Sequence, residues 1–462
     1  MTQRFSCHSP ADGSLVAERA FATSAELDTA LDQARLAQRA WAATPLAERL
    51  TRLTALVDWV VMHKTTLAEE LTAQMGRPIR YAPGEIGGFE VRGRTMIELA
   101  PEALADVRPP EQAGYTRFIR RAPLGVVLVM APWNYPWLTS VNAVIPALAA
   151  GNAVILKHAR QTPLVAERFA QAGREAGLPD GLLTALHLDH DLAAAAITDP
   201  RLDYVAFTGS VDGGHAVRSA AAKRFIATGL ELGGKDPAYV RADADLKQAV
   251  DGIVDGAFFN SGQSCCGIER VYVHESLFDD FVEQSAALVR SYVLGDPREP
   301  ETTLGPVVRA SAAKAIVAQI EGAIAAGARP LIDAKAFGER TLPYLAPQVL
   351  VDVDHTMDVM REETFGPVVG IMSVPDDETA LTLMNDSRYG LTASIWTRDE
   401  EAALTLGPRI ETGTVFMNRC DYLDPYLAWT GVKDSGRGAT LSLLGYEGLT
   451  RPQSFHLRLG RS

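Results

Sequence analysis

The sequence predicts an α/β fold built around parallel sheets, and two observations support this prediction. From about residue 124 onward, short apolar runs alternate with stretches of helical periodicity, which is the pattern of parallel strands joined by crossover helices. The chain has 462 residues, of which 47% are hydrophobic and 22% are charged. A soluble chain of this length and composition is expected to form about two or three domains.

The N-terminal part of the chain is predicted to be helical. We expect one helix over 24–42 and a second over 44–75, because apolar residues recur there at helical spacing. Ser24 can cap the first helix, and Thr44 followed by Pro45 is a favourable start for the second.

Buried strands and crossover helices follow. The strands of a first sheet are expected at 124–130, 153–156 and 204–207, and the helices between them near 139–150, 163–176 and 212–222. A second alternating region extends from about 236 to 416, with strands at 270–273, 368–371 and 394–396.

Two further segments, 115–121 and 454–459, alternate large apolar with charged residues, as half-exposed strands do. They stand at distant positions in the sequence. We expect them to pair into a small protruding sheet that seeks a partner subunit.

Charge, hydropathy and cysteine content argue against several classes of partner and location. The net charge of −13 argues against nucleic acid or an anionic membrane, since both are bound through clustered Lys and Arg. The N-terminus lacks the apolar core of a secretory signal, and the apolar run 124–132 is too short to span a bilayer. The four cysteines have no framework spacing, so we expect reduced thiols and a cytoplasmic location. We expect no metal site, and we interpret His187 and His190 as exposed loop residues.

The strongest chemical signal comes from two motifs, Glu231-Leu-Gly-Gly-Lys235 and Phe258-Phe-Asn-Ser-Gly-Gln-Ser-Cys265, whose key residues are 34 positions apart. A cysteine that forms a covalent intermediate needs a base to hydrolyse it, and Cys265 and Glu231 are candidates for these roles. Apolar neighbours would raise the pKa of Glu231, as suits a general base. The alternatives are a buried structural cysteine and an exposed strand-end glutamate.

Weaker motifs lie near the expected strand ends. Pro132-Trp-Asn-Tyr-Pro136 follows the first strand, where the Asn134 amide can point at a ligand or can belong to a rigid turn. Phe207-Thr-Gly-Ser-Val-Asp-Gly-Gly214 enters a helix, and its backbone N–H groups can face a phosphate, although it is not a G-x-G-x-x-G motif. Lys157 is either a ribose ligand or an exposed strand-end lysine. Glu362-Glu-Thr-Phe-Gly-Pro367 can hold a ribose and a flat ring, or form a capped turn.

Together these motifs, with Asn418, match in order and spacing those of one family, so the chain resembles the NAD(P)-dependent aldehyde dehydrogenase superfamily along nearly its whole length. The resemblance implies an α/β fold with a Rossmann-like cofactor domain, an α/β catalytic domain and a small oligomerisation β-sheet. It assigns 1–106 and 124–232 to the NAD(P)-binding domain, 233–435 to the catalytic domain, and 107–123 and 436–462 to the oligomerisation segment. A homodimer or homotetramer is expected.

The resemblance also implies a mechanism. Cys265 attacks the aldehyde carbon, Asn134 and the Cys265 backbone N–H hold the oxyanion, and Glu231 activates the water that hydrolyses the resulting thioester. The implied cofactor contacts are Trp133, Lys157, Arg160, Gly209, Ser210, Gly214, Glu363 and Phe365.

Three departures from the family pattern concern ligand binding. Arg160 stands where many members have a glutamate. Arginine can attract a 2′-phosphate, so NADP as well as NAD is a possible cofactor. Leu186-His-Leu-Asp-His190 replaces a glycine near the adenine, and Trp429-Thr-Gly431 replaces Phe-Gly-Gly near the substrate entrance.

The expected substrate pocket contains aromatic and acidic residues. Its members are Tyr135, Asn142, Phe259, Cys266, Asp421 and Trp429. Acidic groups beside aromatic rings suit a cationic aminoaldehyde, whereas Asp421 and Asp424 as solvent-facing loop residues would leave aromatic and aliphatic aldehydes equally open. We favour the solvent-facing interpretation.

Two other functions compete with aldehyde oxidation to the acid. A CoA-acylating aldehyde dehydrogenase would resolve the thioester with a thiol, but such relatives tend to lack the glutamate base. A non-catalytic binding or structural member of the fold is the other alternative, against which stand Cys265, Glu231 and Asn134 together.

Overall fold

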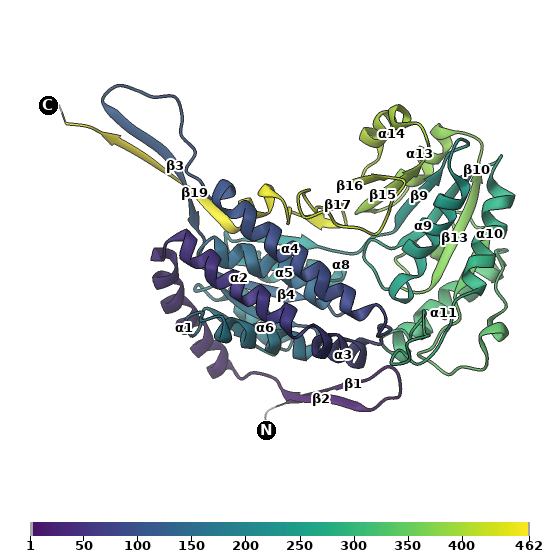
Figure 1. Cartoon of the computed structure of the whole chain (residues 1–462), viewed down its shortest axis with the longest axis horizontal. Helices are drawn as coiled ribbons and strands as arrows, with labels where there is room; N and C mark the ends of the chain where they lie inside the picture. Colours follow the sequence, from purple (N-terminus) through teal and green to yellow (C-terminus); the bar gives the residue numbers. More distant parts are fainter. Residues whose placement is uncertain (1–2, 461–462) are drawn as a thin grey trace.

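The computed structural model describes residues 3–460 and confirms the predicted α/β fold, with two large sheets and a projecting ribbon (Figure 1). Positions 1–2 and 461–462, the ends of the predicted N-terminal domain and C-terminal segment, lie outside the described residues. The domain boundaries stay a prediction.

The first sheet has six strands in the order β18-β8-β7-β4-β5-β6. Its members are β4 (Val126–Ala131), β5 (Ala153–His158), β6 (Leu183–Ala185), β7 (Tyr204–Thr208), β8 (Ala227–Glu231) and β18 (Gly436–Arg437). β4 to β8 pair in parallel, whereas β18 is antiparallel to β8. The crossover helices are α5 (Pro136–Ala149), α6 (Pro163–Glu175), α7 (His190–Thr198) and α8 (Val211–Ala221). The strands and crossover helices predicted for this region are therefore confirmed.

Four helices precede this sheet: α1 (Ser24–Ala43), α2 (Leu46–Met62), α3 (Lys64–Met75) and α4 (Ala82–Ala103). The expected cap at Ser24 is wrong, because Thr23 has the extended backbone of an N-cap and its side chain accepts from the Glu26 N–H in a capping box. The single helix expected over 44–75 is also wrong. The chain breaks at His63, whose ring stacks on Trp59.

Helix α4 was not expected from the sequence, because its glycines are poor helix formers. One of them has a packing reason. A Cβ atom on Gly88 would lie 2.8 Å from Cδ2 of Leu138 on α5, so glycine at this position lets the two helices approach closely. The helix forms because one face buries Ile86, Phe89 and Met96 in the core.

The second sheet has seven strands in the order β11-β12-β13-β10-β9-β15-β16. They are β9 (Asp236–Val240), β10 (Ile268–His274), β11 (Arg329–Pro330), β12 (Gln348–Val351), β13 (Val368–Val374), β15 (Thr392–Trp396) and β16 (Thr414–Met417). All pair in parallel except β11 with β12. The helices of this region are α9 (Leu246–Phe258), α10 (Phe278–Arg290), α11 (Ala310–Ala325), α12 (Asp358–Arg361), α13 (Asp377–Asn385) and α14 (Glu400–Leu406).

The two alternating segments pair as expected. β3 (Tyr115–Pro123) and β19 (Thr450–Arg458) form an antiparallel ribbon that projects from the body (Figure 1), and the rings of Phe118 and Phe455 stack at 4.4 Å. Two shorter pairs are β1 (Arg4–His8) with β2 (Leu15–Ala20) and β14 (Tyr389–Gly390) with β17 (Val432–Lys433). Short 3-10 helices are η1 (Phe259–Gly262), η2 (Ala334–Phe337), η3 (Gly407–Arg409) and η4 (Leu443–Leu449). Within 3–460, no helix has both the length and the apolar character needed to cross a membrane.

Candidate active site

The predicted motifs of the first sheet meet at its carboxyl edge. Met130 near the end of β4 lies opposite both Lys157 on β5 and Phe207 on β7, and Thr208 lies opposite Glu231. The strand order reverses between β4 and β7. Open parallel sheets bind ligands at such a switch point, so the segments that follow these two strands flank the expected cofactor crevice.

Helix α8 presents its N-terminus at this edge. Ser210 is its N-cap and accepts from the Gly213 N–H at 3.2 Å, while the Gly209 N–H donates to the Glu231 carbonyl at 3.0 Å. Gly214 is buried in the first turn. The remaining N–H groups of this turn are available to an anion such as a pyrophosphate.

Two basic side chains lie at the end of β5. Lys157 belongs to the strand, and burial lowers the pKa of its ammonium group, with Arg160 contributing in the same direction. Arg160 is exposed. Behind them, burial lowers the pKa of His158 to about 3, and its ring bonds Ser140 Oγ at 2.8 Å. His158 is therefore a neutral structural residue.

A third group of predicted cofactor residues comes together from distant segments. The rings of Trp133 and Phe365 meet edge to face at 5.5 Å. Glu363 Oε1 accepts from the Gly234 N–H at 3.0 Å, and burial raises the pKa of this carboxyl to about 8. Glu363 thus lies beside the Leu-Gly-Gly segment that follows Glu231, and Phe365, two residues further on, contacts Trp133.

The loop that carries Cys265 packs directly on the same segment. A Cβ atom on Gly234 would lie 2.4 Å from the Cys265 carbonyl oxygen, so glycine is needed where the two motifs touch. Cys265 itself is partly exposed, and all four cysteines are unpaired.

Asn134 is buried and held by this loop. Its Nδ2 donates to the Gln263 carbonyl at 3.2 Å, and its own carbonyl accepts from Asn260 Nδ2 at 3.3 Å and from Arg77 Nη2 at 2.5 Å. Gln263 Oε1 in turn accepts from the Val308 N–H at 2.8 Å. The amide is therefore fixed relative to Cys265.

A cavity of about 430 Å³ opens in front of Cys265. Glu231 and all six expected substrate-pocket residues line it, whereas Asn134 is not among the lining residues. Most of its wall comes from α4, α5, the η1–β10 loop and 421–429, and strands β7 and β8 add Thr208 and Glu231.

Glu231 is a half-buried carboxylate at the end of β8. Its Oε2 accepts from Thr208 Oγ1 at 3.3 Å, and Oε1 accepts from Thr440 Oγ1. Burial raises its pKa, against the opposing effects of these hydrogen bonds and of Arg92. A raised pKa brings a carboxylate closer to the range of a general base at neutral pH.

Asp421 corrects one expectation, because it is half-buried and lines the cavity instead of standing in an exposed loop. Its Oδ1 accepts from Ser264 Oγ at 2.8 Å and from Cys266 Sγ at 3.0 Å, and burial raises its pKa. A hydrogen bond with Cys265 and burial also raise the pKa of the Cys266 thiol. Asp424 caps a turn by accepting from the Tyr426 N–H at 2.9 Å.

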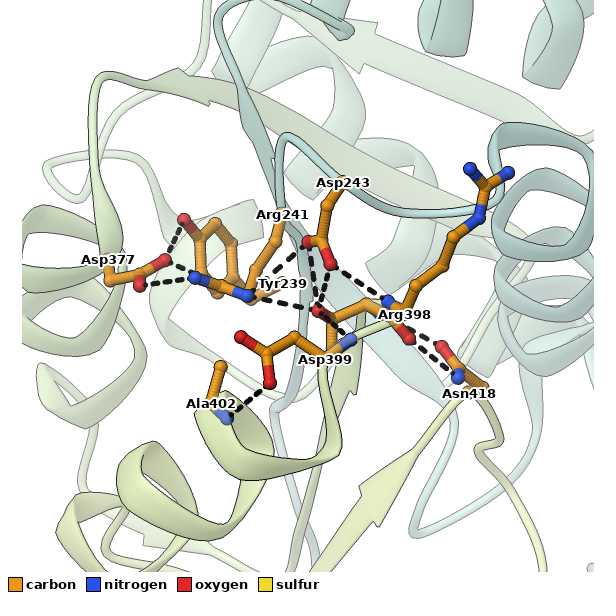
Figure 2. A network of polar contacts seen from close by, with 9 residues as sticks. Tyr239, Arg241, Asp243, Asp377, Arg398, Asp399, Ala402 and Asn418 are labelled. Atoms are coloured by element: carbon orange, nitrogen blue, oxygen red, sulfur yellow. Dashed lines mark hydrogen bonds and ion pairs between the residues drawn. The ribbon is translucent and has the colours of Figure 1, made fainter.

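A polar network holds Asn418, which precedes Asp421 by three residues (Figure 2). Asn418 bonds Thr397 through both its side-chain oxygen and nitrogen, at 3.0 and 2.8 Å. Thr397 Oγ1 donates to Asp243, and Arg241 joins Asp243 to Asp377. The expected motif residue Asn418 therefore fixes the start of the cavity wall.

The expected exposure of His187 is also wrong, because this residue is half-buried and its Nε2 lies 2.9 Å from Glu167 Oε1. His190 begins α7. No group of three or more His, Cys, Asp or Glu side chains in the described part of the chain is arranged to hold a metal ion.

Sequence reasoning missed three charged residues of this site. Arg77 and Glu85 form a buried ion pair, and the Arg77 guanidinium lies 4.4 Å from the Tyr135 ring centre. Arg92 also lines the cavity. The signal that was available is spacing, since Glu85 and Arg92 stand seven residues apart, which places them on the same face of α4.

Comparison with known proteins gives a consistent result. A model of the aldehyde dehydrogenase family matches residues 1–455. Succinate semialdehyde dehydrogenase (NAD(P)+) Sad of Escherichia coli (strain K12) is 35% identical over 439 residues, which is 94% of each chain. Vanillin dehydrogenase of Pseudomonas fluorescens is 37% identical, over 94% of this chain and 90% of that protein. A crystal structure of an aldehyde dehydrogenase from Brucella melitensis biovar abortus 2308 superimposes with a TM-score of 0.95, at 30% identity over 99% of this chain and 95% of that one. The chain therefore belongs to the aldehyde dehydrogenase family and is an NAD(P)-dependent enzyme that oxidises aldehydes.

Proposed function

We propose that this enzyme oxidises its aldehyde through a covalent intermediate on Cys265, which is hydrolysed by water that Glu231 deprotonates. One observation carries the proposal: Cys265 and Glu231, from two different motifs, line the same cavity of about 430 Å³. A nucleophile and a base that share one cavity can act on the same carbon atom in succession.

The chemical roles follow from the surroundings of each group. Cys265 Sγ adds to the aldehyde carbon, and after oxidation the acyl group remains on sulfur as a thioester. Glu231, whose pKa burial raises, takes a proton from the attacking water. Thr208 and Thr440 hold its carboxylate in place.

We assign the stabilisation of the oxyanion to Asn134 and to the Cys265 backbone N–H. An amide NH₂ group has two donors, and the bond to the Gln263 carbonyl uses one of them. The second N–H is the donor that we assign to the developing negative charge. The loop that carries Cys265 holds the Asn134 amide, which does not line the cavity, so this role requires the substrate carbonyl to approach the amide.

The carboxyl edge of the first sheet fits a dinucleotide. We assign the pyrophosphate to Trp133 and the N-terminus of α8 at Gly209, Ser210 and Gly214, because capped helix starts offer free N–H groups to anions. We assign the adenosine ribose to Lys157. Glu363 and Phe365 are assigned to the nicotinamide ribose and ring, since Glu363 accepts from the Gly234 N–H, on which the Cys265 loop packs, and Phe365 contacts Trp133. When bound, NAD or NADP supplies the hydride acceptor of the reaction.

Arg160 bears on the choice between the two cofactors. It is exposed at the end of β5, next to the Lys157 that we assign to the ribose. A guanidinium can bind a 2′-phosphate through a fork of N–H donors, so we propose that NADP is used, alone or together with NAD.

The test uses the Cys265→Ala and Glu231→Gln variants, with Cys7→Ala as a matched control on a cysteine outside the cavity. Cys265→Ala should form no reduced cofactor, whereas Cys7→Ala should retain activity. Products should be the free acid whether or not CoA is present. Formation of an acyl-CoA would establish the CoA-acylating alternative, and full activity of Cys265→Ala would refute the proposal.

We further propose that the β3–β19 ribbon joins subunits into a homodimer or homotetramer. Most of β19 is exposed, and a ribbon of two strands has unpaired edges that favour association. Light scattering on the intact chain and on Phe455→Arg tests this, since loss of the stacked Phe118–Phe455 pair should weaken assembly. The four unpaired cysteines suit a reducing compartment, and we infer a cytoplasmic location from them.

A further inference from the structure

Arg92 is a buried charged residue in the substrate cavity for which the proposed chemistry gives no role. It lies on α4, lines the cavity with Cys265 and Glu231, and is only 8% exposed. Charged side chains are seldom buried to this extent unless an opposite charge accompanies them.

The hydrogen bonds of Arg92 go only to neutral oxygens. Its Nη1 donates to the Leu138 carbonyl at 3.2 Å and to Asn142 Oδ1 at 3.3 Å. Nε and Nη2 have no hydrogen-bond partner among residues 3–460, yet neither atom is sealed from solvent. One side of the guanidinium is therefore fixed on α5, and an adjacent pair of N–H donors is free.

No carboxylate within the described residues forms an ion pair with Arg92, although nearby arginines have such partners. Arg77 pairs with Glu85, and Arg94 on the same helix pairs with Asp58 at 2.6 Å and with Glu90 at 2.9 Å. Burial lowers the pKa of Arg92, while the Glu231 carboxylate, which forms no ion pair with it, opposes this effect. The guanidinium thus lacks a contacting counter-charge.

We propose that Arg92 binds a carboxylate carried by the aldehyde substrate at the end remote from its carbonyl group. This inference rests on the proposed function, because it assumes that the aldehyde carbon lies at Cys265. The free Nε and Nη2 hydrogens form the planar fork that matches the two oxygens of a carboxylate. Arg92 is then a specificity-determining residue, and the substrate class is a short aldehyde that bears an acid group.

Among the charged groups that an aldehyde could carry, a single carboxylate matches the free fork of Arg92 best. A phosphate carries more negative charge than one guanidinium neutralises, and Arg77 is already occupied by Glu85. A cationic aminoaldehyde would meet Arg92, while Asp421 already accepts from Ser264 and Cys266. The anionic interpretation therefore replaces the cationic one.

Matched substrate pairs test the inference on the unmodified enzyme. We would compare 4-oxobutanoate with butanal, and 4-carboxybenzaldehyde with 4-methylbenzaldehyde, by kcat/KM. For at least one pair, kcat/KM for the acid should be about 100-fold higher than kcat/KM for the neutral partner, as expected for a buried, hydrogen-bonded charge pair. Glyceraldehyde 3-phosphate should be a poor substrate. Equal efficiency within both pairs, or a preference for the phosphate, would overturn the inference.

Variants then locate the effect. Arg92→Met should lose about 100-fold in kcat/KM for the preferred acid, mainly through KM, and change little for its neutral partner. Arg92→Lys keeps the positive charge but not the pair of parallel N–H donors. Its kcat/KM for the acid should therefore lie between those of the unmodified enzyme and Arg92→Met. Arg94→Met, two residues further along α4, is the control and should retain the acid preference. Equal losses on both members of a pair would mean that Arg92 supports Glu231 or Cys265 instead.

A binding measurement covers the case in which Arg92→Met does not fold. With the unmodified enzyme and butanal as substrate, butyrate should inhibit competitively at a concentration at least about 10-fold below that of its neutral counterpart butyramide. Equal inhibition by the acid and the amide would contradict the inference. Activity on neutral aldehydes without an acid preference would refute only the role of Arg92, whereas full activity of Cys265→Ala would refute the proposed function.

Discussion

The cofactor edge and the substrate cavity of this enzyme are built in different ways. The edge is formed where parallel strands end, so Asn134, Lys157 and Ser210 are placed by backbone pairing of β4, β5 and β7. The cavity is formed by side chains from helices and loops of both halves of the chain. Backbone geometry therefore sets the place of the cofactor, whereas side-chain burial and charge set the choice of aldehyde.

The two buried arginines that line the cavity, Arg77 and Arg92, differ in their partners. Arg77 has its counter-charge in Glu85 and fixes the backbone of Asn134. Among the residues that the structure describes, Arg92 has only neutral partners, and two of its donor atoms are free. A paired charge holds a wall together, whereas an unpaired one is available to a ligand.

The largest expected effect lies at Glu231, where the edge and the cavity meet. Glu231→Gln removes the base, so kcat should fall by about 10³-fold and the acyl group should accumulate on Cys265. Intact-mass spectrometry after addition of aldehyde and NAD or NADP would detect this adduct. Unchanged turnover without an adduct would show that another group activates the water.

The next largest effect is a difference in the free energy of unfolding between variants of Arg77 and Arg92. Arg77→Met leaves the Glu85 carboxylate buried without its partner and should lower the free energy of unfolding by about 3 kcal/mol. Arg92→Met removes an unpaired buried charge and should change stability by less than about 1 kcal/mol. Urea denaturation of both variants makes the comparison. Similar losses would mean that Arg92 is also a structural residue.

At the cofactor edge, Arg160→Glu should change selectivity rather than overall activity. A carboxylate near the ribose repels a 2′-phosphate, so the ratio of kcat/KM for NADP to that for NAD should fall by about 10-fold or more. Steady-state kinetics with both cofactors measures the ratio. A strong preference for NAD in both the unmodified enzyme and the variant would contradict the proposed role of Arg160.

The smallest effect concerns Glu363, whose pKa burial raises from 4.5 to about 8. Between these values the folded state keeps its proton while the unfolded state loses it, so stability is present below pH 4.5 and falls as pH rises toward 8. Glu363→Gln cannot ionise. The Tm of Glu363→Gln minus the Tm of the unmodified protein should therefore increase by about 2–4 °C between pH 5 and pH 8, as measured by calorimetry. A constant difference would place the Glu363 pKa near its ordinary value.

Much of the framework was predictable from local patterns. Apolar runs located β4, β5 and β7, and their order implied that the Asn134 and Ser210 motifs would lie at one sheet edge. The α4 helix escaped prediction because its glycines obscure the helical signal, and their reason lies in the close contact of Gly88 with Leu138 on α5. Such a contact depends on a neighbour about 50 residues away.

The sequence by itself determined the reactive groups, since the motifs around Cys265 and Glu231 identify a nucleophile and a base wherever they lie. Only the tertiary structure decided the electrostatics of the cavity, because Asp421 proved to accept hydrogen bonds from Ser264 and Cys266, and Arg92 to be buried without a carboxylate partner within 3–460. The physical reason is that the effect of a charge depends on its burial and on its contacts, and both are set by residues far away in the chain.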